Sequence, residues 1–223
     1  MNYLELVQRF CRECGETSVT TTVSQTGKAR LMVDWVNTAY TDIVGSHRDW
    51  GFLRTATSFA TVAAQATYTP TQAGTTNFGM WIKDSFRNYP TATGTDAEIE
   101  MDWIDHDSWR SQYQLGSSRT SYSQPYYFTI TPAKSIGLGP VPSAGYTVTA
   151  DYFKAPVALS GNTDAHLIPT HYEMIIIYRA MMFYGAKEAA GEVYQHGSSE
   201  YKKLLNSLMN DYLPDVEIAG PMI

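Results

Sequence analysis

The chain has 223 residues and a formal net charge of −6, and charged residues make up only 17% of it. An ordinary globular domain carries about a quarter. No run rich in Lys or Arg occurs, which disfavours a protein that binds nucleic acid through its phosphates. The low charge indicates surface that becomes covered by contacts. The length allows one helical body with a β insertion more readily than two independent domains.

The opening sequence, MNYLELVQRF, mixes apolar residues with charged and polar ones and lacks the apolar stretch of a signal peptide. The most apolar run, at positions 174–184, is shorter than a membrane span and contains Arg179. We therefore expect a soluble protein with no membrane partner.

Two helices are expected in the first part of the chain. Apolar residues three and four apart predict a helix over Tyr3–Glu13 and another over 28–47, ended by a left-handed cap at Gly45. The only cysteines, Cys11 and Cys14, form a C-x-x-C motif at the end of the first helix. A redox pair would need a preceding strand, and a zinc site would need two further ligands. We interpret both cysteines as small buried hydrophobic residues.

Between Phe52 and Tyr152 the composition shifts to Thr, Tyr, Gly and Pro, and alternating segments predict a small antiparallel sheet or barrel. The expected strands are 58–68, 78–86, 98–104, 126–131 and 146–154. Aromatic residues in such strands suit a core better than a platform for glycans or bases, because no basic groove accompanies them. These residues are Trp81, Trp103, Trp109, Tyr126 and Tyr127.

An acidic stretch, EIEMDWIDHDSWR, occupies positions 98–110. Acidic and apolar residues alternate in its first half, which predicts a strand with one wet face, and Asp105–Ser108 has the chemistry of a turn. Carboxylates share a metal ion or a proton only when they converge, usually with partners from elsewhere in the chain. We interpret Glu98, Glu100, Asp102, Asp105 and Asp107 as parts of a strand and a turn, not as a catalytic or metal site.

Two more helices are expected toward the other end of the chain. Thr170 and Glu173 have the spacing of a capping box, and the helix after them is apolar on nearly all sides. It is predicted to be a central helix, or one with a face against another subunit. A last helix is expected over 198–212, ended by Pro214, and residues 213–223 follow as an extended tail.

His166 and His171 are the remaining candidate pair of metal ligands. Pro169 between them breaks the helical spacing that would align two ligands, and no H-E-x-x-H pattern occurs. The chain also lacks a Gly-rich phosphate loop, a nucleophile elbow and an internal repeat. We expect no catalytic site, no metal and no cofactor.

Five segments, taken in order, cover nearly the whole chain. They are YLELVQRFCRECG, LMVDWVNTAYTDIVGSHRDWGFLR, MDWIDHDSWRSQY, DYFKAPVALSGNTDAHLIPTHYEMIIIYRAMMFYGAKEAA, and a Tyr-Lys-containing helix followed by Leu-Pro. With this order of segments the chain resembles the head-to-tail adaptor proteins of tailed bacteriophages, also called head-completion or connector proteins.

The resemblance implies a ring, of twelve copies, in the neck of the virion between the portal protein and a tail or neck protein. The genome would pass through the ring without specific binding, and the subunits would be made in the host cytoplasm. The acidic residues of 98–107 would then line the channel or an interface. The end of the chain would reach the portal, with these docking candidates: Leu213, Pro214, Asp215, Val216, Glu217, Ile218, Met222 and Ile223.

The expected fold class is α+β, with a helical body formed by 1–51 and 155–212, a β-rich insertion at 52–154 and a tail at 213–223. The leading hypothesis is a non-enzymatic virion protein. Another neck or tail-terminator protein is an alternative within the same class. Alternatives from other classes are a glycan-binding tail module and a metal-dependent hydrolase that uses the acidic stretch together with His106.

Overall fold

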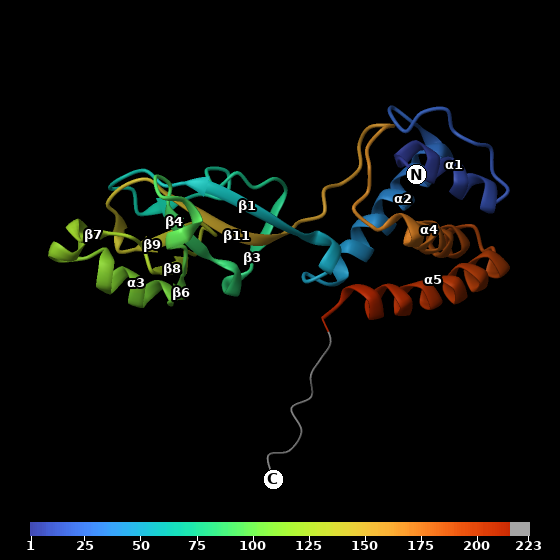
Figure 1. Ribbon diagram of the computed structural model, residues 1–223. Helices are drawn as coiled ribbons and strands as arrows, with labels where there is room; N and C mark the ends of the chain where they lie inside the picture. Colours follow the sequence, from blue (N-terminus) through green and yellow to red (C-terminus); the bar gives the residue numbers. More distant parts are fainter. Residues whose placement is uncertain (215–223) are drawn as a thin grey trace, which may run out of the picture. The chain divides into compact units, whose positions relative to one another are not determined.

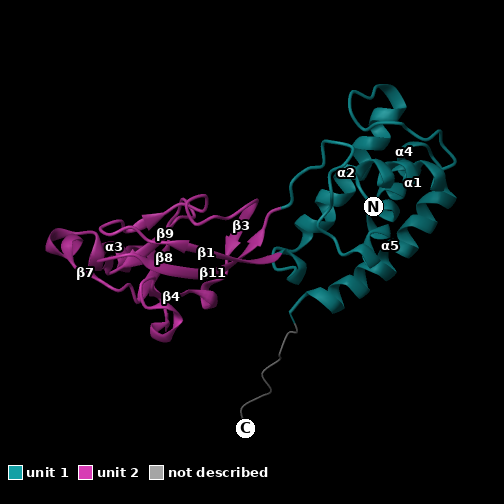
Figure 2. Cartoon of the chain, turned by 45° about the horizontal axis from the view of Figure 1, so that its top comes forward, with its two compact units in different colours: residues 1–53, 156–223 teal, residues 54–155 magenta. Residues whose placement is uncertain are grey.

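The computed structural model describes residues 1–214, and the chain forms two compact units (Figure 2). The helical unit consists of Met1–Leu53 and the residues from Pro156 onward, and the β-rich unit consists of Arg54–Ala155. Helices therefore flank a β-rich region that is inserted between them in the sequence. This arrangement confirms the predicted α+β fold.

The helical unit contains four α-helices and two short 3-10 turns among its described residues (Figure 1). They are α1 (Tyr3–Glu13), α2 (Gly27–Ser46), η1 (Gly51–Leu53), η5 (Thr170–Tyr172), α4 (Met174–Lys187) and α5 (Gly191–Tyr212). Helix α4 contacts the other three helices. Its residues Ile175, Ile176 and Ile177 are fully buried, so the predicted central helix is confirmed. Apolar side chains on several faces are what such a position requires.

Helix α1 begins with a capping box that the sequence analysis did not identify. The Asn2 side chain accepts from the Glu5 backbone N–H at 2.9 Å, and the Glu5 side chain accepts from the Asn2 backbone N–H at 2.8 Å. Two otherwise unpaired donors at the helix N-terminus are thereby satisfied. Cys11 on this helix is fully buried and Cys14 is partly buried, and both are free thiols. The prediction of a buried hydrophobic residue is confirmed for Cys11.

Two predicted helix ends are wrong. Helix α2 runs through Gly45 to Ser46, and its C-cap residue His47 has φ −132°, so no left-handed glycine ends it. At the start of α4, Thr170 lies in the 3-10 turn η5, and Glu173 itself is the N-cap residue without a side-chain capping bond. The Glu173 carboxylate instead contacts the Met1 amino group and His166.

The last helix begins earlier than expected, at Gly191 and not at Ser198, although it ends at Tyr212 as predicted. Gly197 therefore lies inside α5. It is buried, because α5 packs closely against α4 at this point. A glycine in a helical pattern lowers confidence in a helix from sequence alone, but it also permits a close approach between two helices.

The β-rich unit holds eleven short strands: β1 (Arg54–Ala60), β2 (Thr67–Tyr68), β3 (Phe78–Trp81), β4 (Arg87–Pro90), β5 (Ile99–Glu100), β6 (Asp102–Trp103), β7 (Tyr122–Ser123), β8 (Tyr127–Ile130), β9 (Ile136–Gly139), β10 (Val141–Pro142) and β11 (Tyr146–Lys154). Short 3-10 turns η2 (Lys83–Ser85), η3 (Gly94–Ala97) and η4 (Gly116–Thr120) and helix α3 (His106–Tyr113) connect them. The bounds predicted for β11 are correct. The strand predicted over 58–68 is wrong, because β1 ends at Ala60 and β2 belongs to another sheet.

Strand β11 is the centre of a five-stranded sheet (Figure 1). On one side it pairs antiparallel with all of β1, from Arg54 opposite Phe153 to Ala60 opposite Thr147. On the other side it pairs with β4 and β3. The second sheet has the order β2-β9-β8-β6. Aromatic and aliphatic side chains from both sheets form one core. Within it the rings of Phe86 and Phe128 stack, with their centres 4.0 Å apart.

The two sheets meet at the acidic stretch. Strand β5 pairs with β4 in one sheet, whereas β6, two residues later, pairs with β8 in the other. Met101 between them is only 3% exposed. The continuous strand predicted over 98–104 is therefore wrong, because the chain bends at Met101 to serve both sheets. A single strand of constant alternation could not do so.

Candidate interaction surfaces

The second half of the acidic stretch forms a helix and not the predicted turn. Asp105 is the N-cap residue of α3, and its side chain accepts from the backbone N–H groups of Asp107 at 3.1 Å and Ser108 at 2.9 Å. A hydrogen bond from the Ser108 side chain, together with these backbone bonds, holds the pKa of Asp105 below its ordinary value. The sequence signal was readable, since Asp is a preferred N-cap residue.

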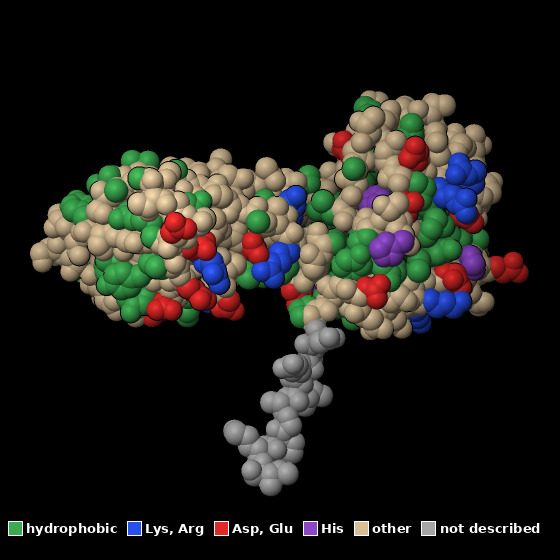
Figure 3. Space-filling model, viewed as in Figure 1, with side chains coloured by type: hydrophobic (Ala, Val, Ile, Leu, Met, Phe, Trp, Pro, Cys, Tyr) green, Lys and Arg blue, Asp and Glu red, His purple; other side chains and the backbone are tan. Residues whose placement is uncertain are grey.

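The carboxylates of the acidic stretch lie on the surface and do not converge. Glu98, Glu100, Asp102, Asp105 and Asp107 are all exposed, and none of them forms an ion pair within residues 1–214. Over the same residues, no group of three His, Cys, Asp or Glu side chains is placed to hold a metal ion. Figure 3 shows several acidic side chains of the β-rich unit gathered beside hydrophobic ones. Such a surface is suited to contact with a partner, or to repulsion of phosphates.

The aromatic residues predicted to be core differ in burial, and Tyr127 is only partly buried. Trp81 and Trp109 are each 3% exposed, and their indole N–H groups donate to the carbonyls of Lys134 at 2.9 Å and Leu138 at 3.0 Å. Their assignment to the core is confirmed.

Trp103 and Tyr126 are 44% and 45% exposed, so the same prediction is wrong for these two residues. The Lys83 Nζ atom lies 3.5 Å from the centre of the Trp103 ring. The centres of the Tyr126 and Tyr127 rings lie 4.7 Å apart. The half-covered rings do not form a bare platform for glycans. The cation over Trp103 also offsets part of the local negative charge.

The end of α5 is fixed by an aromatic cluster. The centre of the Tyr212 ring lies 5.5 Å from that of Phe52 and 6.2 Å from that of Tyr172. The Tyr172 hydroxyl donates a hydrogen bond of 2.6 Å to the Asp211 carboxylate. The carboxylate of Asp211 raises the pKa of Tyr172 to about 12. The C-terminal end of α5 is therefore held against η1 and η5 of the same unit.

Two docking candidates, Leu213 and Pro214, lie directly after this end of α5. The other candidates lie outside the described residues: Asp215, Val216, Glu217, Ile218, Met222 and Ile223.

The two histidines do not form a metal pair. The His166 side chain is 6% exposed and lies 3.4 Å from the Glu173 carboxylate, whereas His171 is exposed. Burial lowers the pKa of His166, although Glu173 opposes this effect. The interpretation of His166 as structural agrees with these contacts. Sequence spacing could not reveal its partner, because a glutamate at a helix start is normally assigned to capping.

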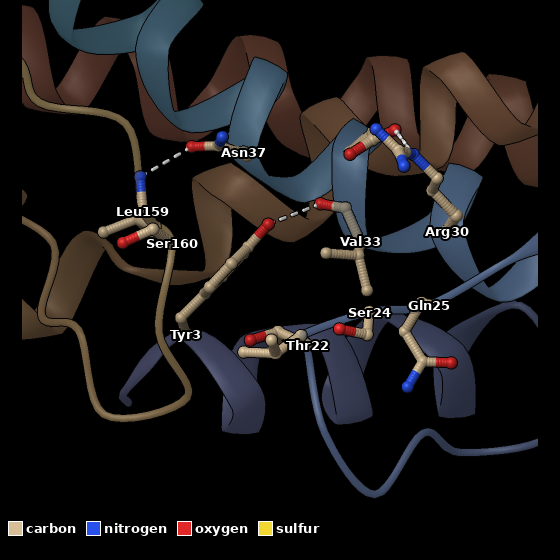
Figure 4. Close-up of a pocket in the computed structure, with 11 residues that line it drawn as sticks. Tyr3, Thr22, Ser24, Gln25, Arg30, Val33, Asn37, Leu159 and Ser160 are labelled. Atoms are coloured by element: carbon tan, nitrogen blue, oxygen red, sulfur yellow. Dashed lines mark hydrogen bonds and ion pairs between the residues drawn. The ribbon is translucent and has the colours of Figure 1, made fainter.

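A cavity of about 250 Å³, which we call the socket, opens in the helical unit (Figure 4). Buried residues of four segments form its floor: Tyr3, Thr22, Val33 and Leu159. Its rim carries polar side chains: Ser24, Gln25, Arg30, Asp34, Asn37 and Ser160. The Tyr3 hydroxyl donates to the Val33 carbonyl at 2.8 Å, and Asn37 accepts from the Leu159 N–H at 2.9 Å. These bonds make the socket a preformed feature.

One side chain orders the loop beside the socket. The Asn162 side-chain oxygen accepts from the Thr22 backbone N–H at 2.7 Å and from the Thr22 hydroxyl at 2.8 Å. No local pattern predicts this cavity, because Leu159 and Ser160 lie more than a hundred residues after the other residues that line it.

None of the helices within residues 1–214 is long and apolar enough to cross a membrane. The family model described as SU10 adaptor protein matches residues 1–219, and the chain belongs to this family. The match confirms the resemblance to adaptor proteins that the order of sequence segments predicted. A search of curated proteins gave no match.

Proposed function

We propose that the chain is a structural virion protein of a tailed bacteriophage, a head-to-tail adaptor that forms a ring between portal and tail. The observation that carries the proposal is the adaptor-family match over residues 1–219. We place the protein in the virion neck, in twelve copies, with no catalytic activity and no cofactor. A neck protein at a different level of the same passage is the second candidate, supported by the same match.

The charge of the protein supports a role around a DNA channel. Each copy contributes a net charge of −6, so a ring is strongly acidic. A negative wall repels phosphates and lets DNA slide without sticking. The exposed carboxylates of the acidic stretch, Glu98, Glu100, Asp102, Asp105 and Asp107, are candidates for this wall or for an interface.

The tail supplies attachment to the portal in this proposal. Burying Val216, Ile218, Met222 and Ile223 contributes about 1.5 to 3 kcal/mol for each side chain. Ordering the tail costs about 1 to 2 kcal/mol per residue, which cancels most of the gain. A single tail therefore binds weakly, whereas tails repeated around a ring act at high effective concentration.

The test is binding to the portal protein of the same phage. A chain that ends at Pro214 should lose portal binding, and so should one in which the four apolar tail residues are replaced by Ser. The matched control carries Asp215→Asn and Glu217→Gln, which keep the tail length and its apolar side chains. Undiminished binding of the truncated chain would remove the tail from the proposal, and no binding of the intact chain would contradict the adaptor role.

A further inference from the structure

The socket has the size and chemistry of a receptor for one aromatic side chain. Its volume of about 250 Å³ lies below the roughly 300 to 1,000 Å³ of small-molecule sites. Its floor is buried and partly apolar, with Tyr3 at 2%, Val33 at 6% and Leu159 at 6% exposure. Its polar rim suits an amphipathic ring such as that of tyrosine, whose hydroxyl finds hydrogen-bond partners there.

The β-rich unit presents such a ring at one end. Tyr122 lies on the two-residue strand β7, which pairs only with β10, and its side chain is 50% exposed. Between positions 111 and 133 the only charged residue is Arg119. The end that carries β7 shows hardly any charged side chains in Figure 3. Two copies of a chain with net charge −6 can approach at such a surface without strong repulsion.

The charges beside the ring and the socket are complementary. Arg119 is exposed, its Nε donates to the Gln114 carbonyl at 2.6 Å, and it forms no ion pair with a carboxylate among residues 1–214. Asp34 at the socket rim contacts Arg30 at 3.4 Å, with the two side chains 55% and 69% exposed. An ion pair this exposed is weak, so Asp34 can accept another cation.

We propose that Tyr122 of one copy binds the socket of a neighbouring copy, where Arg119 faces Asp34. The inference rests on the proposed adaptor function and names the contact between its subunits. Because Tyr122 and the socket lie on different surfaces of the chain, the contact joins unlike faces of two copies. Such contacts generate a ring when the rotation between neighbours closes. The other exposed aromatic residues of the β-rich unit fit less well, since Trp103 is covered by Lys83 and Tyr126 lies beside the acidic residue Asp102.

A charge exchange tests the pairing of Arg119 with Asp34. Each single variant, Arg119→Asp or Asp34→Lys, should weaken the association between copies of the chain. Mass photometry of the portal-bound protein measures this as the number of copies per portal. The double variant should restore that number. Damage to the fold would not be restored in this way. Tyr122→Ala should lower the association constant about tenfold or more. Its matched control is Tyr194→Ala, which removes another exposed tyrosine, 41% exposed, outside the proposed contact.

Cysteine cross-linking tests the geometry. A chain with both Tyr122→Cys and Gln25→Cys should give a ladder of covalent oligomers on oxidation of portal-bound rings, and neither single variant should do so. A ladder from the single variants, or none from the pair, overturns the proposed contact. Rings that form on the portal without this cross-link leave the adaptor function standing and refute only the contact, whereas failure of the unmodified chain to bind the portal refutes the function.

Discussion

Gly197 of α5 lies directly against the backbone of α4, so closely that a Cβ atom at this position would stand 2.9 Å from the Tyr178 carbonyl oxygen and 3.0 Å from the Met181 Cβ. The close packing of these two helices therefore depends on a missing side chain. The contact also explains why α5 continues through a glycine that would otherwise weaken it.

Gly197→Ala should lower the free energy of unfolding by about 1 to 3 kcal/mol, because the helices must move apart to admit the methyl group. Urea denaturation measures the change. Gly191→Ala in the same helix is the control, since nothing lies within 4 Å of the Cβ it adds. Equal stability of the two variants would show that the helices do not pack this closely.

Asn88 should tie strand β4 to the segment that precedes β8. It is fully buried, donates to the Pro125 carbonyl at 2.6 Å and accepts from the Gln124 side chain at 3.0 Å. Asn88→Ala should cost about 1 to 3 kcal/mol, because two polar groups lose their partner in the interior. Thermal unfolding followed by circular dichroism checks this result. Gln112→Ala on the exposed side of α3 should have little effect.

The stability of the helical unit should fall in mild acid through His166. Its pKa in the folded protein is lowered below 6.5, so the unfolded chain binds more protons as the pH falls below that value. The free energy of unfolding should therefore decrease as the pH falls below about 6.5. His166→Gln should reduce this decrease, whereas His196→Gln at an exposed position should not. An unchanged pH profile in His166→Gln would contradict the assignment.

Asp105 should stabilise α3 as a cap and not as a metal ligand. Asp105→Ala should lower the melting temperature, because two backbone N–H groups lose their acceptor, and Asp105→Asn should largely retain it. Asp102→Ala, an exposed neighbour without such bonds, is the control. Since the pKa of Asp105 is lowered, its contribution should be present above about pH 4 and lost as acid protonates it.

Metal analysis of the purified protein separates the adaptor from a hydrolase built on the acidic stretch. We expect no stoichiometric divalent ion, because the exposed carboxylates of this stretch point to no common centre among the described residues. One tightly bound ion per chain, lost in Asp102→Ala, would support the hydrolase.

The spacing of apolar residues predicted correctly those helices and strands that keep the same neighbours along their whole length. Strand β11 alternates buried and partly buried residues over most of its length, and α4 is apolar on the faces that its neighbours cover. The prediction of a single strand failed where one segment pairs with two different sheets, as it does on either side of Met101. Sequence prediction also failed where a distant group decides the outcome, as when the Glu173 side chain contacts His166 instead of closing a capping box. The socket, built from separated segments, left no local pattern to read.

The most direct test of the adaptor role is electron microscopy of this protein mixed with the portal protein of its own phage. If the chain is a head-to-tail adaptor, a ring of added density should lie coaxial with the portal, present with the full chain and lost when the chain ends at Pro214. A portal that stays bare at high concentrations of the intact protein would contradict it.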